Sequence, residues 1–365
     1  MGSRQVSSIR RFPIGSLVVV GLVSIGVGST DAALKTTKTT RSIKSTGVAA
    51  ETEQGSVQKP RLYSAERSLS RQVMRARARA AAQARQTAEA TLPRYRVDAS
   101  GDLVPDVRAA AAIIYDPDTN QVLWEENSQS RRSIASITKV MTATVVLENN
   151  PDVTQPVTIA RSDVFQASTT HLRGNDQVTV DDLLHLLLIA SDNAAARALA
   201  RVSPYGSEGF VQRMNGKAAE LGLESTHYAD TSGLLSENVS SAYDMARLIT
   251  HASGDERIAS IMRTPEYTVY MANRRVVTFH STNHLLGRDD VDVRAGKTGF
   301  IAKAGYCLAT LLRLPQGGRQ VAVVVLGARS NAGRFVETRN LFSWLLAKAP
   351  TIFGTKIPLQ PQPQQ

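Results

Sequence analysis

The stretch that decides the fold is residues 133–148, SIASITKVMTATVVLE. From Ser136 onward its apolar residues recur at helical spacing, in a stripe made of Ile137, Val140, Met141 and Val145. On such a helix Ser136 and Lys139 lie one turn apart on the same face. We therefore predict a helix from Ser136 to Glu148 that presents a serine and a lysine together at its start.

The Ser136–Lys139 pair has the composition of a nucleophile and its base. A serine hydroxyl is a weak nucleophile until a neighbouring group takes its proton. A lysine amine can take that proton when burial and nearby positive charge lower its pKa from about 10.4 toward neutrality. We expect the helix N-terminus and a second lysine, Lys297, to lower the pKa of Lys139 in this way.

Two further short motifs follow in order, S-D-N at 191–193 and K-T-G at 297–299. Each is weak alone, because the chain also holds decoys, S-V-Q-K at 56–59 and S-E-N at 236–238. The decoy at 56–59 is followed by a proline and has no helical pattern, whereas Ser136 stands where a helix begins. Context therefore favours Ser136 as the start of the reactive set.

The remaining patterns predict an α+β fold. Strand-like runs at both ends of the body form two antiparallel hairpins, at 109–125 and 306–328. Helical patterns lie between and after these hairpins, over Asp181–Arg201, Met214–Leu221, Ala242–His251 and Ala332–Lys348. This order predicts three α/β/α layers, with an antiparallel sheet flanked by helices and an inserted helical subdomain.

The net charge of +11 over 365 residues resembles that of nucleic-acid-binding proteins. However, residues 1–105 hold 17 Lys/Arg and 7 Asp/Glu, whereas residues 106–365 hold 26 and 25. The excess charge belongs to the N-terminal part, so we expect no nucleic acid partner.

The chain divides into four predicted segments: a signal peptide at 1–32, a basic linker at 33–104, a catalytic domain at 105–350 and a Pro/Gln-rich tail at 351–365. The first segment has arginines followed by an uncharged run from Phe12 to Gly28, with the small residues Thr30 and Ala32 suited to cleavage. An uncleaved membrane anchor is the alternative, because this run is near the lower length limit of a spanning helix. Either way we expect export to the periplasm or cell envelope.

Within the linker, residues 62–90 are rich in Ala and Arg, with high helix propensity but little apolar surface to bury. A solvated helix or a disordered spacer is the simplest interpretation. The functional alternative is contact between residues 61–96 and an anionic envelope polymer or lipid headgroups.

We expect no metal and no other cofactor. One cysteine excludes an internal disulfide and a Cys-based metal cluster. His280 and His284 are four residues apart but lack the H-E-x-x-H pattern, and His185 lies in an apolar helix. We expect Cys307 to be a small buried residue rather than a nucleophile.

The three motifs in this order resemble those of serine penicillin-recognising enzymes. Within that group the chain is similar to the D-alanyl-D-alanine carboxypeptidase family, peptidase S11, and especially to its endopeptidase, or penicillin-binding protein 7, type. Beside residues 133–148, the stretches that carry this likeness are LLLIASDNAAARALA at 186–200, MNGKAAELGLESTHYADTSGL at 214–234, SAYDMARLI at 241–249, TNHLL at 282–286 and AGKTGFIAKAGYCL at 295–308.

The resemblance implies an acyl-enzyme mechanism. Ser136 would attack the carbonyl of the penultimate D-Ala of a peptidoglycan stem peptide, and β-lactams would acylate the same serine. Lys139 would be the general base, and Ser191 would relay a proton toward the leaving amine with Lys139 and Lys297 close by. The structural alternatives are an N-cap for Ser136, a surface position for Lys139 and a helix-terminus residue for Ser191.

The resemblance also implies a binding site. Asn193 would bind the substrate backbone, and Lys297 with Thr298 would hold the terminal carboxylate from a strand that faces the cleft. Gly299 would allow close backbone approach, and the backbone N–H groups of Ser136 and Phe300 would form the oxyanion hole. The structural alternatives are a link between subdomains for Asn193 and a charged guard of an edge strand for Lys297.

The leading hypothesis is therefore a serine DD-peptidase of cell-wall synthesis and remodelling, acting as carboxypeptidase, endopeptidase or both. The short remainder after Lys348, without a second β-rich domain or an amphipathic helix, favours the endopeptidase type. A serine β-lactamase is one alternative, disfavoured because no glutamate stands in an E-x-x-L-N segment. A catalytically silent wall-binding protein is the other, disfavoured by the intact motifs.

Overall fold

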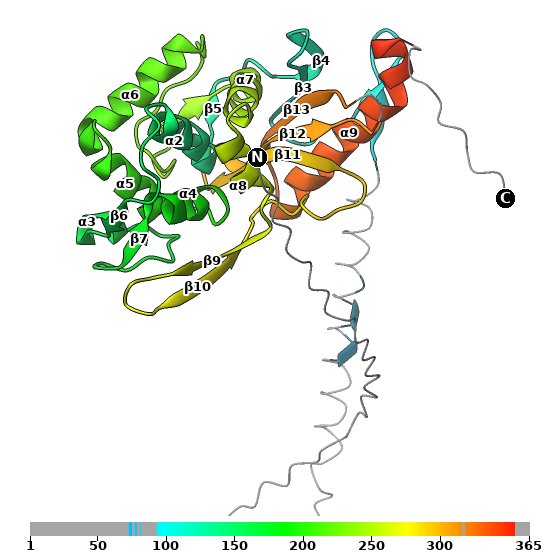
Figure 1. Ribbon diagram of the computed structural model, residues 1–365. Coiled ribbons are helices and arrows are strands. Elements are labelled where there is room, and N and C mark those ends of the chain that lie inside the picture. Colours follow the sequence, from blue (N-terminus) through cyan, green and yellow to red (C-terminus); the bar gives the residue numbers. More distant parts are fainter. Residues whose placement is uncertain (1–72, 75–76, 79–80, 82–92, 316–317, 355–365) are drawn as a thin grey trace, which may run out of the picture. The chain divides into compact units, whose positions relative to one another are not determined.

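The computed structural model describes residues 73–74, 77–78, 81, 93–315 and 318–354, all within one unit that spans residues 66–365 (Figure 1). The predicted signal peptide, nearly all of the linker before Pro93 and the tail after Gly354 lie outside the described residues. The few described residues of the Ala/Arg-rich stretch are helical. Among the described residues, no helix is long and apolar enough to cross a membrane.

A five-stranded antiparallel sheet forms the centre of the body, in the order β11-β12-β13-β3-β4 (Figure 1). Its strands are β3 (Ala111–Asp116), β4 (Gln121–Glu126), β11 (Asp292–Ile301), β12 (Gly305–Arg313) and β13 (Gln320–Ala328). The two predicted hairpins are confirmed, and they join where β13 pairs with β3, with Val324 opposite Ile113. The sheet therefore unites both ends of the body and leaves β11 at one edge.

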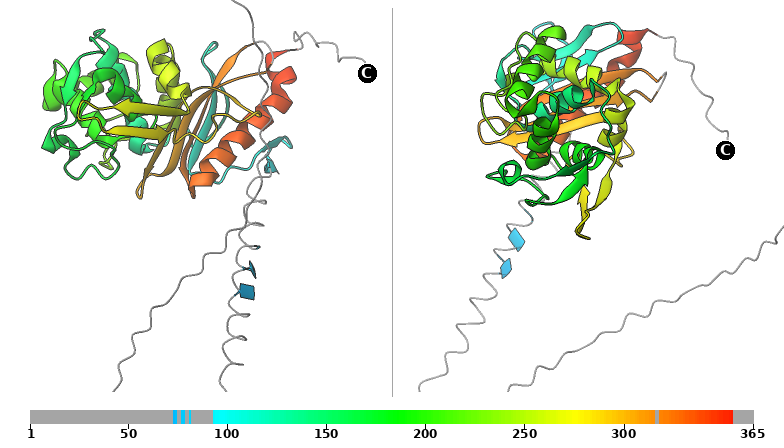
Figure 2. Two further views of the ribbon diagram at one scale, coloured as in Figure 1. Left: turned by 60° about the horizontal axis from the view of Figure 1, so that its bottom comes forward. Right: turned by 60° about the vertical axis from the view of Figure 1, so that its left-hand side comes forward.

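Helices cover both faces of this sheet. The helix α9 (Asn331–Phe353) packs on one face, and α7 (Ala242–Ser253) and α8 (Glu256–Arg263) pack on the other (Figures 1 and 2). Alternation along β13 explains this, because Val323 belongs to the apolar cluster with α9 and Val324 to the cluster with α7. The predicted three-layer α+β architecture is confirmed.

The inserted helical subdomain lies between β4 and β11 in the chain. It contains α2 (Thr138–Leu147), α3 (Arg161–Val164), α4 (Val180–Leu188), α5 (Asn193–Val202) and α6 (Gly206–Glu220). Nine of the ten residues of α2 are buried, and α2 packs against α4, α5, α6 and α7. The helix that carries Lys139 is therefore at the centre of the subdomain, buried all round rather than amphipathic.

The prediction of one continuous helix over Asp181–Arg201 is wrong. The helix α4 ends at Leu188, α5 begins at Asn193, and Ser191 between them has a φ of 60°. Asp192 caps α5 by accepting the N–H of Ala195 at 3.0 Å. Local side-chain hydrogen bonds of this kind compete with a continuous helix, so the S-D-N motif forms a corner instead of a helical turn.

Two described strands lie before or at the predicted domain boundary, Pro105. The strand β1 (Tyr95–Val97) pairs antiparallel with β2 (Leu103–Pro105), and Trp344 Nε1 on α9 donates to Leu103 O at 2.9 Å. The linker composition concealed this hairpin because three-residue strands are too short to show a periodicity.

Three further two-stranded ladders had not been predicted. They pair β5 (Arg132–Ser133) with β8 (Val239–Ser240), β6 (Pro156–Thr158) with β7 (Gln177–Thr179), and β9 (Glu266–Tyr270) with β10 (Val276–His280). The helix α6 also begins at Gly206 rather than at Met214, since its glycine-containing first turns have weak helix propensity.

Candidate active site

Ser136 lies in a 3-10 turn, η1 (Ala135–Ile137), directly before α2. The preceding Ala135 has a φ of 48°, a left-handed conformation that is uncommon for residues other than glycine. Two glycine backbones flank the turn, because an ideal Cβ on Gly233 would lie 2.9 Å from Ser136 N and one on Gly299 would lie 3.1 Å from it. Glycine is needed at both positions for the chain to pass this close to the serine amide.

Lys139 is fully buried on the first turn of α2, beneath Ser136. Its Nζ donates to three oxygens, at 2.9 Å to Ser136 Oγ, 2.6 Å to Asn193 Oδ1 and 2.6 Å to Ser232 O. The structure therefore brings the predicted serine–lysine pair together, and it adds two acceptors that hold the amine in place.

The charge state of Lys139 depends mainly on its burial. Burial lowers the pKa of Lys139 to about 7; Asp230 and Asp192 act against this shift, and Arg197 adds to it. A pKa near neutrality leaves a substantial fraction of the amine uncharged at pH 7, and the uncharged amine is the form that can accept a proton. The predicted direction of the shift is supported by this environment.

Lys297 is buried on the edge strand β11, and its Nζ donates to Ser191 Oγ at 2.8 Å and to Thr298 O at 2.9 Å. Burial lowers the pKa of Lys297 well below its usual value, and Lys139 and Arg334 contribute to the decrease. The S-D-N and K-T-G motifs thus meet through Ser191 and Lys297.

Asn193 connects the motifs in a different way. Its Oδ1 accepts from Lys139, while its Nδ2 donates to Ala167 O at 2.7 Å and to Ser168 Oγ at 3.3 Å. Both ends of this buried amide are therefore engaged by the protein. This geometry supports a structural role for Asn193, as a link between α2 and the 167–168 loop. Its contact with substrate stays a prediction.

The rest of the K-T-G strand lies along the same site. Thr298 Oγ1 is 2.6 Å from Thr282 Oγ1, and an ideal Cβ on Gly299 would lie 2.7 Å from Ile134 O. Phe300 is half exposed, and its ring stacks on Tyr306 with the centroids 4.2 Å apart. The Phe300 ring thus packs on Tyr306 with part of its surface open to solvent.

Sequence reasoning missed several residues that support these side chains. Arg334 of α9 donates to Gly299 O at 3.1 Å and to Cys307 O at 3.3 Å, so it ties the K-T-G strand to β12 and to α9. Ser232 and Thr282 stand in the stretches TSGL and TNHLL, which carried the family resemblance but no assigned role. Arg334 had no signal of this role, because the Gly299 and Cys307 carbonyls that it holds lie on strands distant in the sequence.

The histidines and the cysteine lie in ordinary structural surroundings. His280 pairs with Glu266 at 3.0 Å, His284 stacks on Phe335, and His185 stacks on Tyr267. Over the part of the chain that the structure describes, no three His, Cys, Asp or Glu side chains group into a potential metal site.

Cys307 is buried, as predicted. Burial raises the pKa of its thiol to about 11, which keeps the sulfur protonated and unreactive at neutral pH.

A serine and a buried lysine at the start of a central helix, facing a lysine on the edge of an antiparallel sheet, define the class of penicillin-recognising serine enzymes. The structure of the Streptomyces K15 DD-transpeptidase agrees with this class, with 28% identity, a TM-score of 0.62, and coverage of 67% of this chain and 98% of that one.

The family follows from sequence comparison. The family described as D-alanyl-D-alanine carboxypeptidase, peptidase S11, matches residues 98–330. This chain therefore belongs to the D-alanyl-D-alanine carboxypeptidase family, and the predicted family and fold are confirmed.

Individual relatives carry two activity names. The D-alanyl-D-alanine endopeptidase of Escherichia coli is 32% identical over 66% of this chain and 78% of the relative, and that of Pseudomonas aeruginosa is 34% identical over 67% and 79%. Relatives named D-alanyl-D-alanine carboxypeptidase are 30–33% identical over 61–65% of their length.

Proposed function

We propose that this chain is a serine DD-peptidase that cleaves peptidoglycan stem peptides after the penultimate D-Ala through an acyl-enzyme on Ser136. The observation that carries the proposal is the 2.9 Å hydrogen bond between Lys139 Nζ and Ser136 Oγ, made by a fully buried lysine whose pKa is about 7. This arrangement activates a serine without a histidine.

In the proposed acylation step, uncharged Lys139 takes the proton of Ser136 Oγ, and the oxygen attacks the substrate carbonyl carbon. The backbone N–H groups of Ser136 and Phe300 stabilise the negative charge that develops on the carbonyl oxygen. The C–N bond then breaks as the leaving amine takes, through Ser191, the proton that Lys139 had accepted, which leaves Lys139 uncharged again. Ser191 accepts a hydrogen bond from Lys297. Water hydrolyses the acyl-enzyme in the second half of the reaction.

In the proposed binding mode, Lys297 and Thr298 hold the terminal carboxylate of the substrate, and Asn193 contacts its backbone while it holds Lys139. Gly299 lets the strand pass close to the serine amide. A bound carboxylate would favour the charged form of Lys297, whose pKa burial otherwise lowers.

We propose endopeptidase action on the D-Ala to diamino-acid cross-link as the main activity. It is supported by relatives of that name, which are matched over 78–80% of their length. Release of a terminal D-Ala uses the same acyl-enzyme and differs only in the leaving amine, so carboxypeptidase activity accompanies it in this proposal.

The proposed place of action is the periplasm or cell envelope, reached through a signal peptide at residues 1–32. The family match at residues 98–330 lies in the proposed catalytic domain at 105–350, apart from residues 98–104, which belong to the predicted 33–104 segment. The proposed contact of residues 61–96 with an anionic envelope polymer depends on the arginines up to residue 85. The remaining two, Arg94 and Arg96, already pair with Glu337 and Glu126 of the body.

Covalent labelling by a fluorescent penicillin tests the acyl-enzyme. We expect labelling of the full chain and its loss in Ser136→Ala, with strongly reduced labelling in Ser191→Ala. Ser56→Ala, in the S-V-Q-K decoy at 56–59, is the matched control and should label like wild type. An unlabelled wild-type protein would refute the enzyme and leave the silent wall-binding alternative.

Digestion of purified peptidoglycan followed by mass spectrometry tests the substrate. Conversion of cross-linked dimers to monomers supports endopeptidase action, whereas loss of single D-Ala residues alone contradicts it as the main activity. Rapid hydrolysis of a chromogenic cephalosporin, in place of a stable adduct on Ser136, would favour the β-lactamase alternative.

A further inference from the structure

The loop at residues 230–238, which we call the Asp230 loop, contacts the reactive pair Ser136 and Lys139 but is not part of α2. It supplies the Ser232 carbonyl that accepts from Lys139 Nζ at 2.6 Å. It also supplies the Thr231 carbonyl that accepts from Thr142 Oγ1 at 2.6 Å. Its Gly233, with a φ of 82°, lies so close that an added Cβ would be 2.0 Å from Ala135 O.

One carboxylate organises this loop. Asp230 Oδ1 accepts the backbone N–H groups of Ser232 and Gly233, each at 2.6 Å, and the Ser232 hydroxyl at 2.9 Å. Asp230 Oδ2 accepts the Leu235 N–H at 2.6 Å and Asn238 Nδ2 at 3.1 Å. Five donors converge on one side chain, and hydrogen bonds to a charged acceptor are stronger than neutral ones.

We propose that Asp230 is a positioning residue for acylation, which holds the Ser232 carbonyl on Lys139 and the Gly233 backbone against the Ser136 turn. This inference rests on the proposed function. It gives a role to a residue that no sequence motif singled out, and it names the loop as part of the machinery that places the general base.

The same carboxylate also affects the charge of Lys139. The charged groups that act on Lys139 are Asp230 and Asp192, which stabilise the ammonium form, and Arg197, which opposes it; Lys297 lies in the same site. Removing the negative charge of Asp230 therefore shifts the balance toward the uncharged amine. Loss of Asp230 has two separable consequences, a misplaced base and a base that titrates at lower pH.

Asp230 is not available as a base for water. Both of its oxygens are occupied by donors of its own loop, so it differs from a glutamate that activates the deacylating water of a β-lactamase. The Asp230 loop thus positions the acylation machinery and leaves the fate of the acyl-enzyme to other groups.

The test is the pH profile of acylation of the full chain by a fluorescent penicillin. The wild-type rate should rise with pH to a plateau, with the midpoint of the rise at about 7, because uncharged Lys139 is the active form. Asp230→Asn keeps the size of the side chain but replaces one acceptor oxygen with an N–H₂ group that faces the N–H donors of the loop. The plateau rate of acylation should therefore fall roughly 10- to 100-fold. Its midpoint should move to lower pH.

Asp244→Asn is the matched control. Asp244 is buried and, like Asp230, accepts a backbone N–H and a hydroxyl, here from Ser225 and Thr226, each at 2.8 Å. It lies at the start of α7 and not on the Asp230 loop. Asp244→Asn should lower the melting temperature without moving the midpoint of the acylation profile.

Asp230→Glu tests the position of the carboxylate separately from its charge. It also replaces Asp230→Asn as the test if that variant does not fold. It keeps the negative charge but lengthens the side chain, so the plateau should fall with the midpoint near that of wild type. The inference would be overturned if the folded Asp230 variants reached the wild-type plateau rate of acylation, or if Asp230→Asn left the midpoint unchanged. In either case, labelling of the wild-type protein would leave the proposed function standing. Absence of wild-type labelling would instead overturn the proposed function itself.

Discussion

At the scale of single residues, Gly299 shows how little space the site leaves around the nucleophile. Gly299 lies on β11, and its backbone passes close to the Ser136 turn. A methyl group on Gly299 would lie 2.7 Å from Ile134 O and 3.1 Å from Ser136 N. Both contacts are with backbone, which cannot rotate away as a flexible side chain does. The serine amide and the strand therefore depend on one another for their positions.

We predict that Gly299→Ala slows acylation of Ser136 by roughly 100-fold, because a displacement of about 1 Å at the reacting atoms is enough for such a loss. The rate constant for fluorescent penicillin labelling measures this. Gly209→Ala on α6 is the control, since its added Cβ would make only an ordinary contact, 3.5 Å from Tyr205 Cβ. That helical substitution should stabilise the fold by up to about 1 kcal/mol and leave labelling unchanged. A Gly299→Ala protein that labels at the wild-type rate would contradict the prediction.

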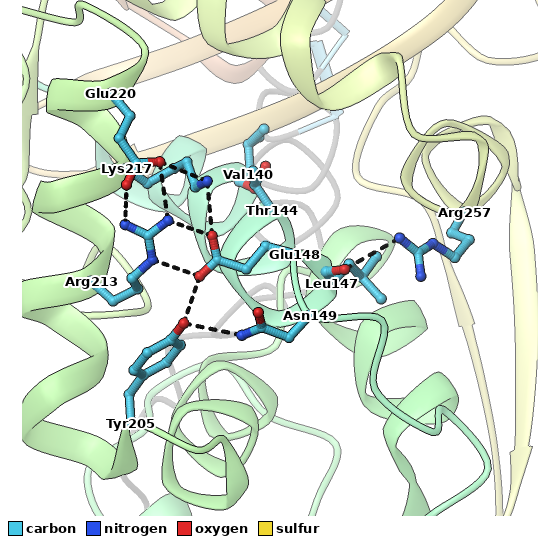
Figure 3. Close-up of polar contacts among 10 residues, drawn as sticks. All are labelled: Val140, Thr144, Leu147, Glu148, Asn149, Tyr205, Arg213, Lys217, Glu220 and Arg257. Atoms are coloured by element: carbon cyan, nitrogen blue, oxygen red, sulfur yellow. Dashed lines mark hydrogen bonds and ion pairs between the residues drawn. The ribbon is translucent and has the colours of Figure 1, made fainter.

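At the scale of elements, α2 is anchored at the end opposite to Lys139. Glu148, at its C-terminus, accepts from Arg213 at 2.6 Å, Lys217 at 2.8 Å and Tyr205 at 2.9 Å (Figure 3). Burial alone would raise the pKa of Glu148, but the hydrogen bonds from these three residues lower it to about 2. The helix that carries the reactive pair is thus tied to α6 by a mostly buried carboxylate.

We predict that Glu148→Gln lowers the free energy of unfolding by about 2–3 kcal/mol at pH 7. Because the folded pKa lies below the unfolded value of about 4.5, the stabilisation is complete above that pH and is lost as the pH falls toward 2. Urea unfolding at pH 7 and near pH 3 should therefore show a gap between wild type and variant that narrows in acid. The control Glu220→Gln, at a half-exposed partner of Arg213, should show a smaller loss. A gap that widens in acid would refute the assignment.

At the scale of the whole molecule, an ion pair and a hydrogen bond connect the N-terminal part of the body to its C-terminal helix α9. Arg94, before β1, pairs with Glu337 of α9 at 2.7 Å, and the Arg108 N–H donates to the same carboxylate at 3.2 Å. Burial raises the pKa of Glu337, and Arg94 counteracts this increase. The N-terminal hairpin is therefore part of the folded body, on the α9 side of the sheet.

We predict that Arg94→Ala destabilises the fold by about 3 kcal/mol at pH 7, because it leaves the Glu337 carboxylate buried without its cation. The folded pKa of Glu337 is raised above the unfolded value, so the penalty is present at neutral pH and decreases in acid, where the carboxyl is protonated. Thermal unfolding at pH 7 and near pH 4 measures both. Arg96→Ala is the control, since the exposed Arg96–Glu126 pair should contribute less than about 1 kcal/mol. Equal losses in the two variants would contradict this account.

Much of the architecture was predictable because it depends on local periodicity. The hairpins at β3–β4 and β12–β13 and the helices α2, α7 and α9 follow from alternating or helical spacing of apolar residues. The break at Ser191 escaped prediction, because the apolar pattern of α4 runs on into α5 and only the Asp192 cap interrupts it. The N-terminal hairpin escaped because its two short strands are held by distant partners on α9.

The sequence by itself determined the family and the positions of the three motifs, because these are properties of residue order. It also places the start of the reactive helix to within two residues, because the spacing of Ser136 and Lys139 is local; the pattern predicts a start at Ser136, whereas α2 begins at Thr138 after the 3-10 turn. Only the tertiary structure decided what surrounds Lys139. Its acceptors Asn193 and Ser232 lie 54 and 93 residues further along the chain, and its full burial results from packing against four helices. A pKa shift and an occupied hydrogen-bonding site arise from all neighbours at once, so no local pattern could reveal the role of Asp230 or Arg334.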